Sequence, residues 1–137
     1  MNRAKILIVE DDADTRKALN VRLRANNYDT VYAVDGFSAV SAAAKEHPDV
    51  ILLDLGLPAG DGFTVMERLQ SNPTLATIPV IVLTGRDRKG NWERAMEAGC
   101  YAFFQKPPDT QALMAALQTA VGAARQNAAE EVPSGRL

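Results

Sequence analysis

Short apolar segments that alternate with helical stretches restrict the fold of this 137-residue chain more than any other feature. Four segments are continuously apolar, and a fifth is weaker. The four lie at residues 6–9, 50–53, 80–83 and 101–104, and the fifth at 30–34. Such short apolar runs are typical of strands that helices cover on both faces in a parallel sheet. The alternation predicts βα repeated five times, an α/β doubly wound sheet, although the order of the strands does not follow from it.

The stretches between these segments have the spacing of amphipathic helices. The last stretch shows it best, with Leu113, Leu117 and Val121 each four residues apart. Asp109 precedes that helix and is a candidate for its N-cap, because a carboxylate there can accept from free backbone N–H groups. Gly99 stands where a glycine usually ends a helix, just before the last apolar segment.

Length and composition favour one domain. Hydrophobic residues make up 47% of the chain, which is enough for an ordinary buried core. We expect this domain to span residues 1–123. Residues 124–137 have few large apolar side chains, so we expect a helix end and a flexible tail or the start of a linker. Cys100, the single cysteine, excludes an internal disulfide and is expected to pack in the core.

Charge and hydropathy argue against several classes of partner. A net charge of −2 gives no reason to expect nucleic-acid binding by this chain. No apolar run approaches the roughly 20 residues of a membrane-spanning helix. The first run ends in three acids and is too short for a signal peptide, so we expect a cytoplasmic protein. His47, the one histidine, precedes Pro48 and is expected in a loop or at a helix end.

Polar residues follow four of the five apolar segments directly. Three acids at 10–12 follow the first segment, Asp54 the third, Thr84 the fourth and Lys106 just after the fifth. The carboxyl ends of parallel strands meet at one edge of the sheet, where ligands bind, so these groups should meet there. Each residue alone has an ordinary explanation as part of a solvated loop, a turn or a cap. The joint pattern is what predicts a site.

Clustered carboxylates at this edge would need a cation. Two carboxylates about 4 Å apart repel by about 4 kcal/mol at an effective dielectric constant near 20. Oxygen ligands without histidine or cysteine favour a hard divalent ion. Mg²⁺ fits because it retains waters that a phosphate can replace, and Mn²⁺ would satisfy the same ligands. We expect Asp11 and Asp54 to hold the metal.

A carboxylate beside a divalent ion is suited to accept a phosphoryl group and form an acyl phosphate. The transferred group spreads negative charge over its oxygens, so a metal, a cation and a hydroxyl all stabilise it. The sequence therefore predicts Asp54 as the acceptor. Lys106 would contact one phosphoryl oxygen, and Thr84 would donate a hydrogen bond to another.

Together these motifs resemble the receiver domains of bacterial two-component response regulators, the CheY-like superfamily. The match covers about residues 4–122, and its motifs are residues 5–12 ending in Glu10-Asp11-Asp12, Asp54 to Pro58, Asp61-Gly62, Thr84-Gly85 and Lys106-Pro107. The resemblance implies a flavodoxin-like fold with strand order 2-1-3-4-5. It also implies transfer of a phosphoryl group to Asp54 from a histidine kinase or a histidine phosphotransfer protein.

The resemblance assigns roles to further residues. It implies Asp11 as a direct ligand of the magnesium ion and Glu10 as an acid that acts through water. The third protein ligand would be the backbone carbonyl of Gly56, where other members often carry a side chain. The bond between Lys106 and Pro107 would be cis.

The resemblance also implies that phosphorylation repacks the face formed by the fourth helix, the fifth strand and the fifth helix. Here that face would include Trp92, Arg94, Phe103 and part of Gln111–Arg125. Thr84 and Phe103 would be the switch residues: Thr84 moves toward the phosphoryl group and Phe103 turns inward. The face would then control a downstream protein or an output domain, or form a homodimer. The chain would be a stand-alone regulator or the receiver of a longer protein.

Three alternatives fit the residues less well. A degenerate receiver that serves only as a scaffold would not need the complete set of acids, hydroxyl and lysine. An aspartyl phosphohydrolase usually carries a second acid two residues after its nucleophile, where this chain has Gly56. A flavin-binding module would want a phosphate loop after the first strand, where three acids stand. We therefore expect a signalling protein that does not turn over an external substrate.

Overall fold

The computed structural model describes residues 3–59 and 61–135, in which five strands and five helices alternate. The strands are β1 (Lys5–Val9), β2 (Asp29–Ala33), β3 (Val50–Leu53), β4 (Val80–Thr84) and β5 (Ala102–Gln105). The helices are α1 (Ala13–Ala25), α2 (Gly36–Glu46), α3 (Gly62–Gln70), α4 (Arg88–Glu97) and α5 (Thr110–Gly135). Each strand lies within one residue of its predicted position, which confirms the alternation.

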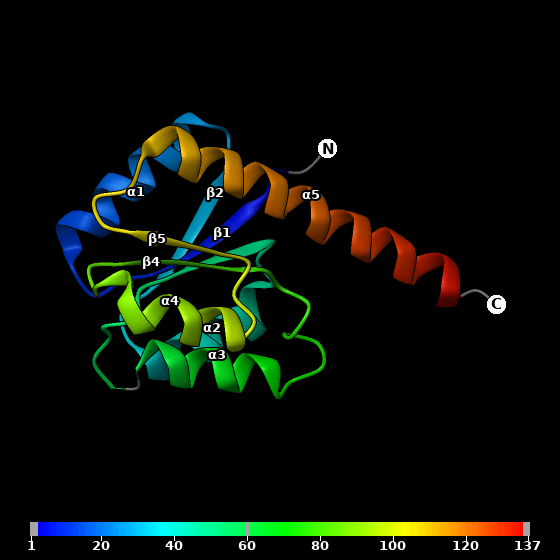
Figure 1. The fold of residues 1–137 in the computed structure, drawn as a ribbon. Helices are drawn as coiled ribbons and strands as arrows, with labels where there is room; N and C mark the ends of the chain where they lie inside the picture. Colours follow the sequence, from blue (N-terminus) through cyan, green and yellow to red (C-terminus); the bar gives the residue numbers. More distant parts are fainter. Residues whose placement is uncertain (1–2, 60, 136–137) are drawn as a thin grey trace.

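All strand pairs are parallel, and the order β2-β1-β3-β4-β5 confirms the one that the resemblance implied. Helices cover both faces of the sheet, with α1 and α5 on one side and α2, α3 and α4 on the other (Figure 1). Two hydrophobic cores result, one on each face. This arrangement explains the continuous apolarity of the strands, because the side chains of β3 are at most 1% exposed on either face.

Aspartates begin the helices at the carboxyl edge of the sheet. Asp12, Asp35, Asp61 and Asp87 are the N-caps of the first four helices, and each side chain accepts from a backbone N–H of the first turn. Asp109 does the same for α5, accepting from the N–H of Ala112 at 3.1 Å, as predicted. Such caps typically stabilise a helix by about 1 kcal/mol. They also give the edge of the sheet a surplus of negative charge.

Other predictions concern helix ends. Gly99 has a φ of 93° and follows α4, which confirms it as the terminating glycine. His47 is the C-cap of α2 with a φ of 48°, so it lies at a helix end. Cys100 is 6% exposed and packs in the core beneath α4.

The fifth helix is longer than the sequence suggested. Its backbone is helical to Gly135, and Figure 1 shows it extending beyond the sheet. We expected a helix end and tail from residue 124, and the division into 1–123 and 124–137 stays a prediction, with residues 136–137 outside the described part. Among the described residues, no helix combines the length and apolarity needed to cross a membrane.

Candidate functional site

The register of the strands brings two predicted acids together. Val9 of β1 lies opposite Leu53 of β3, so Glu10 and Asp54 follow as neighbours at the carboxyl edge. The backbone N–H of Asp54 donates to the carbonyl of Val9 at 3.1 Å and extends the pairing by one residue. The position of each acid is therefore set by where its apolar strand ends.

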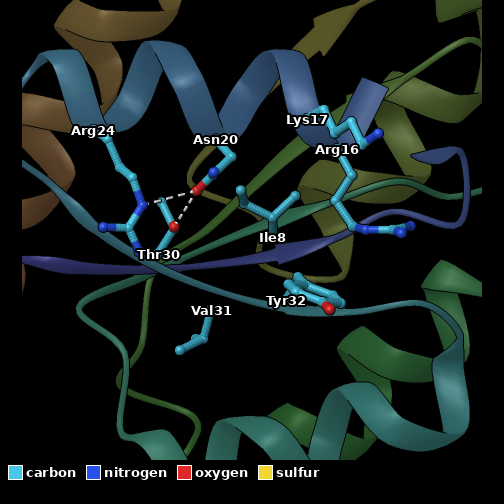
Figure 2. A pocket seen from close by; sticks show the side chains of 8 residues that line it. All are labelled: Ile8, Arg16, Lys17, Asn20, Arg24, Thr30, Val31 and Tyr32. Atoms are coloured by element: carbon cyan, nitrogen blue, oxygen red, sulfur yellow. Dashed lines mark hydrogen bonds between the residues drawn. The ribbon is translucent and has the colours of Figure 1, made fainter. Parts of the chain in front are cut away.

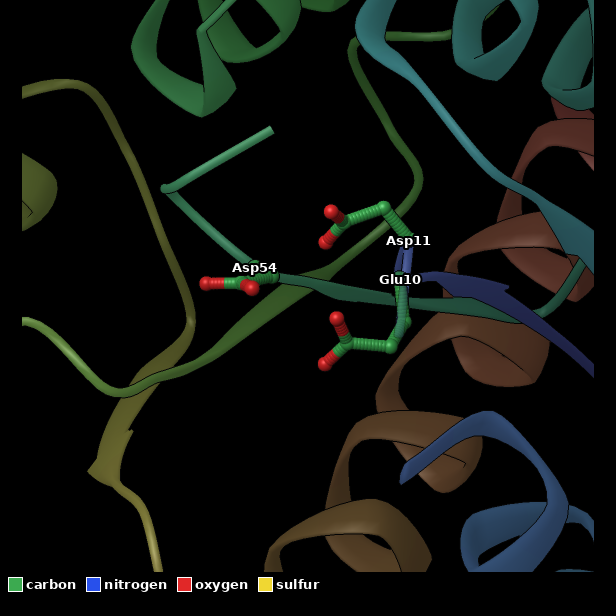
Figure 3. A group of neighbouring side chains, drawn as sticks. All are labelled: Glu10, Asp11 and Asp54. Atoms are coloured by element: carbon green, nitrogen blue, oxygen red, sulfur yellow. The ribbon is translucent and has the colours of Figure 1, made fainter. Parts of the chain in front are cut away.

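Glu10, Asp11 and Asp54 form one acidic cluster. Each offers a carboxylate oxygen that lies within 4.8 Å of the other two, and Figure 3 shows the three side chains grouped at the ends of β1 and β3. Glu10 is 3% exposed and Asp54 is 8% exposed, whereas Asp11 is exposed. The carboxylates of Glu10 and Asp54, which directly follow β1 and β3, are thus largely removed from water, which strengthens the repulsion between them.

Lys106 brings a positive charge to this cluster. Its backbone N–H donates to the carbonyl of Thr84 at 2.8 Å, and the following peptide bond to Pro107 is cis, as the resemblance implied. Its ammonium group hydrogen-bonds to Glu10 and lies 3.4 Å from a carboxylate oxygen of Asp54. The acids of β1 and β3 therefore share one cation supplied from the end of β5.

Burial and charge shift the pKa values of this pair. Burial raises the pKa of Glu10, and the nearby Asp54 charge acts in the same direction, against hydrogen bonds from Lys106 and the N–H of Asp12. Burial alone would lower the pKa of Lys106, but the hydrogen bond to Glu10 and the charge of Asp54 outweigh it and raise the pKa. The ammonium group is thus held protonated by the acids around it.

The two predicted switch residues are buried. Thr84 is 0% exposed, and its hydroxyl oxygen accepts from the backbone N–H of Arg86 at 3.2 Å. Phe103 is 8% exposed and belongs to the core beneath α2, α3 and α4. The Phe103 ring already packs inward in this structure. An inward turn on phosphorylation would therefore require a second state in which the ring points outward.

Gly56 lies two residues after Asp54 and holds the Asp54 carboxylate through its backbone. The N–H of Gly56 donates to one carboxylate oxygen of Asp54 at 3.2 Å, while Lys106 contacts the other. A side chain at Gly56 would meet the guanidinium nitrogen of Arg86 at 3.8 Å, which is an ordinary contact. The Arg86 side chain therefore lies beside Gly56, two residues from Asp54.

Arg86 also forms an ion pair that the sequence did not predict. One guanidinium nitrogen lies 2.9 Å from a carboxylate oxygen of Asp61, and the pair joins the loop after β4 to the start of α3. Burial acts to raise the pKa of Asp61, but the N–H of Phe63 and the Arg86 charge lower it overall. Two loops that border Asp54 are thus tied together above the site.

Gly62 is required by a close approach of backbone. A Cβ at this position would lie 2.6 Å from Cα of Leu55 and 2.7 Å from the carbonyl oxygen of Asp54. Only glycine lets the start of α3 pack this closely against the segment of Asp54 and Leu55. The Asp61-Gly62 pair was one of the motifs in the sequence. The structure shows why its second residue must be glycine.

Arg16 also makes contacts that the sequence did not predict. Its guanidinium donates to the backbone carbonyl of Glu10 at 3.0 Å and to that of Asp11 at 3.3 Å. It also lies over the ring of Tyr32, 5.0 Å from the centroid. Arg16 therefore fixes the backbone of the loop that presents two of the three acids.

One predicted surface residue faces elsewhere. We expected Arg94 on the face of α4, β5 and α5, but its guanidinium lies over the ring of Phe63 in α3, 3.9 Å from the centroid. Cation–π contact with α3 holds it there. Trp92 does remain partly exposed, at 37%, with the guanidinium of Arg88 5.2 Å from its ring centroid.

Comparison with known proteins agrees with this geometry. A sequence profile described as the response regulator receiver domain matches residues 6–118. The response regulator PleD of Caulobacter vibrioides is 38% identical over 116 residues, which cover 85% of the chain but 26% of PleD. The polar-differentiation response regulator DivK of Brucella ovis is 36% identical over 102 residues, covering 74% of the chain and 83% of DivK. The chain thus spans about a quarter of PleD and most of DivK.

Solved structures of receiver domains also resemble this chain. The receiver domain of the sensor histidine kinase PA1611 from Pseudomonas aeruginosa, described with a magnesium ion coordinated in its active site cleft, matches with a TM-score of 0.81 and 29% identity. That match covers 88% of this chain and 98% of the other. The BeF3-activated receiver domain of RstA from Klebsiella pneumoniae matches with a TM-score of 0.80 and 30% identity, covering 85% and 97%.

Proposed function

The chain belongs to the response regulator receiver domain family, and on that premise we propose that Asp54 accepts a phosphoryl group from a histidine of a partner protein. The partner would be a sensor histidine kinase or a histidine phosphotransfer protein. One observation carries the proposal: the Asp54 carboxylate lies within 4.8 Å of two further carboxylates and 3.4 Å from the ammonium group of Lys106. Few structural roles would keep three acids together at the edge of a sheet.

The transfer itself needs only nucleophile, leaving group and charge stabilisation. A carboxylate oxygen of Asp54 forms a bond to phosphorus while the bond from phosphorus to the histidine nitrogen breaks. The imidazole keeps the electron pair of that bond, and the product is an acyl phosphate. Lys106 would contact one phosphoryl oxygen, and the 3.4 Å distance between its ammonium group and the Asp54 carboxylate supports this role. The Thr84 hydroxyl would donate to a second oxygen.

The residues present fit a magnesium ion. All three clustered side chains offer carboxylate oxygens, which are the ligands that this hard ion prefers. Asp11 and Asp54 would hold the ion directly, Glu10 through water, and Gly56 through its backbone carbonyl. When bound, the ion would neutralise charge on the transferring phosphoryl group. Manganese would suit the same ligands.

The proposed output is a change at the face of α4, β5 and α5. The Thr84 hydroxyl oxygen accepts from the N–H of Arg86, so a shift of Thr84 toward a phosphoryl group would pull on the loop that begins α4. Phe103, on β5 beneath α4, would respond by repacking rather than by first turning inward. We propose that this face contacts a downstream protein, an output domain or a second copy of the chain.

The same proposal places the chain among signalling proteins rather than enzymes. Asp54 would be modified and restored without turnover of an external substrate. We propose a cytoplasmic location and no direct contact with nucleic acid, as expected from the charge of the sequence. A scaffold that works without phosphorylation is the outcome that a negative test would favour.

Intact mass after incubation with acetyl phosphate tests the acceptor. We expect the mass of one phosphoryl group to be added in the presence of Mg²⁺, and none with a chelator. Asp54→Asn should add none. Asp61→Asn, which removes a neighbouring carboxylate outside the cluster, should still be modified. The proposal would be contradicted if Asp54→Asn gained a phosphoryl group. It would also be contradicted if the wild type gained none from either acetyl phosphate or a phosphorylated histidine kinase.

A further inference from the structure

A groove between α1 and β2 lies outside the site described above. It has a volume of about 280 Å³ and is lined by Arg16, Lys17, Asn20 and Arg24 of α1 and by Thr30 and Tyr32 of β2, among others. Figure 2 shows the α1 side chains lying above β2, with Arg24 at one end and Arg16 beside Tyr32 at the other. The proposed phosphotransfer does not use this groove.

The groove is positively charged. In the described part of the chain, no carboxylate lies within salt-bridge distance of Lys17 or Arg24. Arg24 uses one nitrogen to donate to the side-chain oxygen of Asn20 at 3.2 Å, and the rest of its guanidinium remains available. Arg16 is already held by the carbonyls of the β1–α1 loop, so it is not counted. Two cations are therefore open to an anionic partner.

The strand below these cations is an edge of the sheet, because within residues 3–59 and 61–135 β2 pairs with β1 alone. The N–H of Asp29 donates to the carbonyl of Ala4, and the carbonyl of Ala33 accepts from Glu10, so these residues turn their backbone groups toward β1. In a strand the direction alternates, and the backbone groups of Thr30 and Tyr32 therefore point outward. An exposed edge of this kind can pair with a further strand.

The position of the groove along the edge of β2 favours an extended chain over a nucleotide, because the outward backbone groups of the strand can pair with a further strand. One face of the Tyr32 ring is covered by Arg16, although the residue is 64% exposed overall. Lys17 and Arg24 are about 10 Å apart along the helix. Side chains on the same face of a strand repeat about every 6.6 Å. The side chains of Lys17 and Arg24 are long enough to reach two acids at that spacing.

We propose that the edge of β2 binds an acidic segment of a partner protein as an added strand. The segment pairs through its backbone with Thr30 and Tyr32. Its acidic side chains, at alternate positions, point toward α1 and contact Lys17 and Arg24. Backbone pairing supplies affinity for any extended chain, and the two cations select for acidic side chains.

A hexapeptide of alternating glutamate and valine is the probe. Its affinity for the full chain is measured by isothermal titration calorimetry, beside a peptide with glutamine in place of glutamate and one with the glutamates grouped at one end. The double variant Lys17→Glu/Arg24→Glu should bind the alternating peptide at least about tenfold more weakly, equivalent to about 1.4 kcal/mol. Lys45→Glu/Arg68→Glu, which changes two exposed cations on α2 and α3 by the same total charge, should bind like the wild type.

Hydrogen exchange separates strand pairing from simple charge attraction. With the alternating peptide bound, the amides of Thr30 and Tyr32 should exchange more slowly, while the glutamine peptide should protect them less. The proposal is overturned if the alternating peptide does not bind, or if both double variants weaken it equally. It is also overturned if the peptide with grouped glutamates binds as tightly as the alternating peptide, or if the amides of Thr30 and Tyr32 are not protected.

Discussion

Asp11→Asn should make the metal-free protein more stable, although the residue is proposed to bind the metal. The Asp11 carboxylate lies within 4.8 Å of the carboxylates of Glu10 and Asp54. The described part of the chain gives Asp11 no salt bridge that would offset this repulsion. Asparagine keeps the size of the side chain and removes one negative charge, so the folded state loses repulsion without losing an ion pair.

The size of the effect follows from the exposure of Asp11. Because this side chain is exposed, a water-like dielectric constant applies, and each repulsion at 4.8 Å amounts to about 0.9 kcal/mol. Two such repulsions, partly offset by the nearby ammonium group of Lys106, leave a gain of about 1 kcal/mol. With a urea m-value near 2 kcal/mol/M, the midpoint of unfolding should rise by about 0.5 M.

Magnesium should reverse the order of the two proteins. A ligand at 100 times its dissociation constant stabilises the folded state by about 2.7 kcal/mol, and Asp11→Asn should lose most of that gain. Urea unfolding followed by circular dichroism, with a chelator and then with excess Mg²⁺, measures both terms. Asp14→Asn removes an exposed charge of the first turn of α1 and should slightly lower stability in both conditions. The reasoning is refuted if Asp11→Asn is less stable without metal, or if Mg²⁺ stabilises it as much as the wild type.

Three further predictions concern positions away from the acidic cluster or beside it. Gly62→Ala would place a Cβ 2.6 Å from Cα of Leu55 and should destabilise the fold by about 1–3 kcal/mol, as the urea midpoint would show. Hydrogen bonds from Ser38 lower the pKa of Asp35, so its carboxylate stabilises the fold above about pH 4 and less as pH falls through the lowered pKa. Asp35→Ala should therefore lose stability at neutral pH, and the difference from the wild type should shrink near pH 3 in urea titrations. Burial raises the pKa of the Cys100 thiol, so native protein should react slowly with iodoacetamide and unfolded protein quickly, by intact mass.

The sequence predicted most of the fold because burial on both faces leaves a plain signal. Each apolar run ends where its strand reaches the carboxyl edge, so the polar residue that follows is placed by the strand itself. This is why the sequence alone predicts that Glu10, Asp54 and Thr84 lie close together. Strand order is different, since alternation of strands and helices is the same for several orders, and only the family resemblance implied the one observed.

The contacts that the sequence did not predict join loops or bring side chains back to the backbone. Arg86 and Asp61 are 25 residues apart and meet because two loops converge above Asp54. No periodic pattern sets the conformation of such loops. Arg16 is a similar case, because an arginine on the surface of α1 can adopt many conformations in water. Whether it donates to the carbonyls of Glu10 and Asp11 depends on how the helix begins. Phe103 was identified by position, but its burial depends on how α4 packs.

The charges of the cluster explain why a divalent cation and a phosphoryl group fit the same edge of the sheet. Three carboxylates and one ammonium group sum to −3 + 1 = −2. A divalent ion would balance that charge and weaken the hold of Glu10 on Lys106. The proposed phosphorylation of Asp54 would then replace one negative charge by about two. The new charge would be met by donors at the ends of β4 and β5: the Thr84 hydroxyl, and the Lys106 ammonium group once its hydrogen bond to Glu10 is weakened. Movement is therefore expected where these strands lead into α4 and α5, rather than at β1 and β3, whose acids are already occupied.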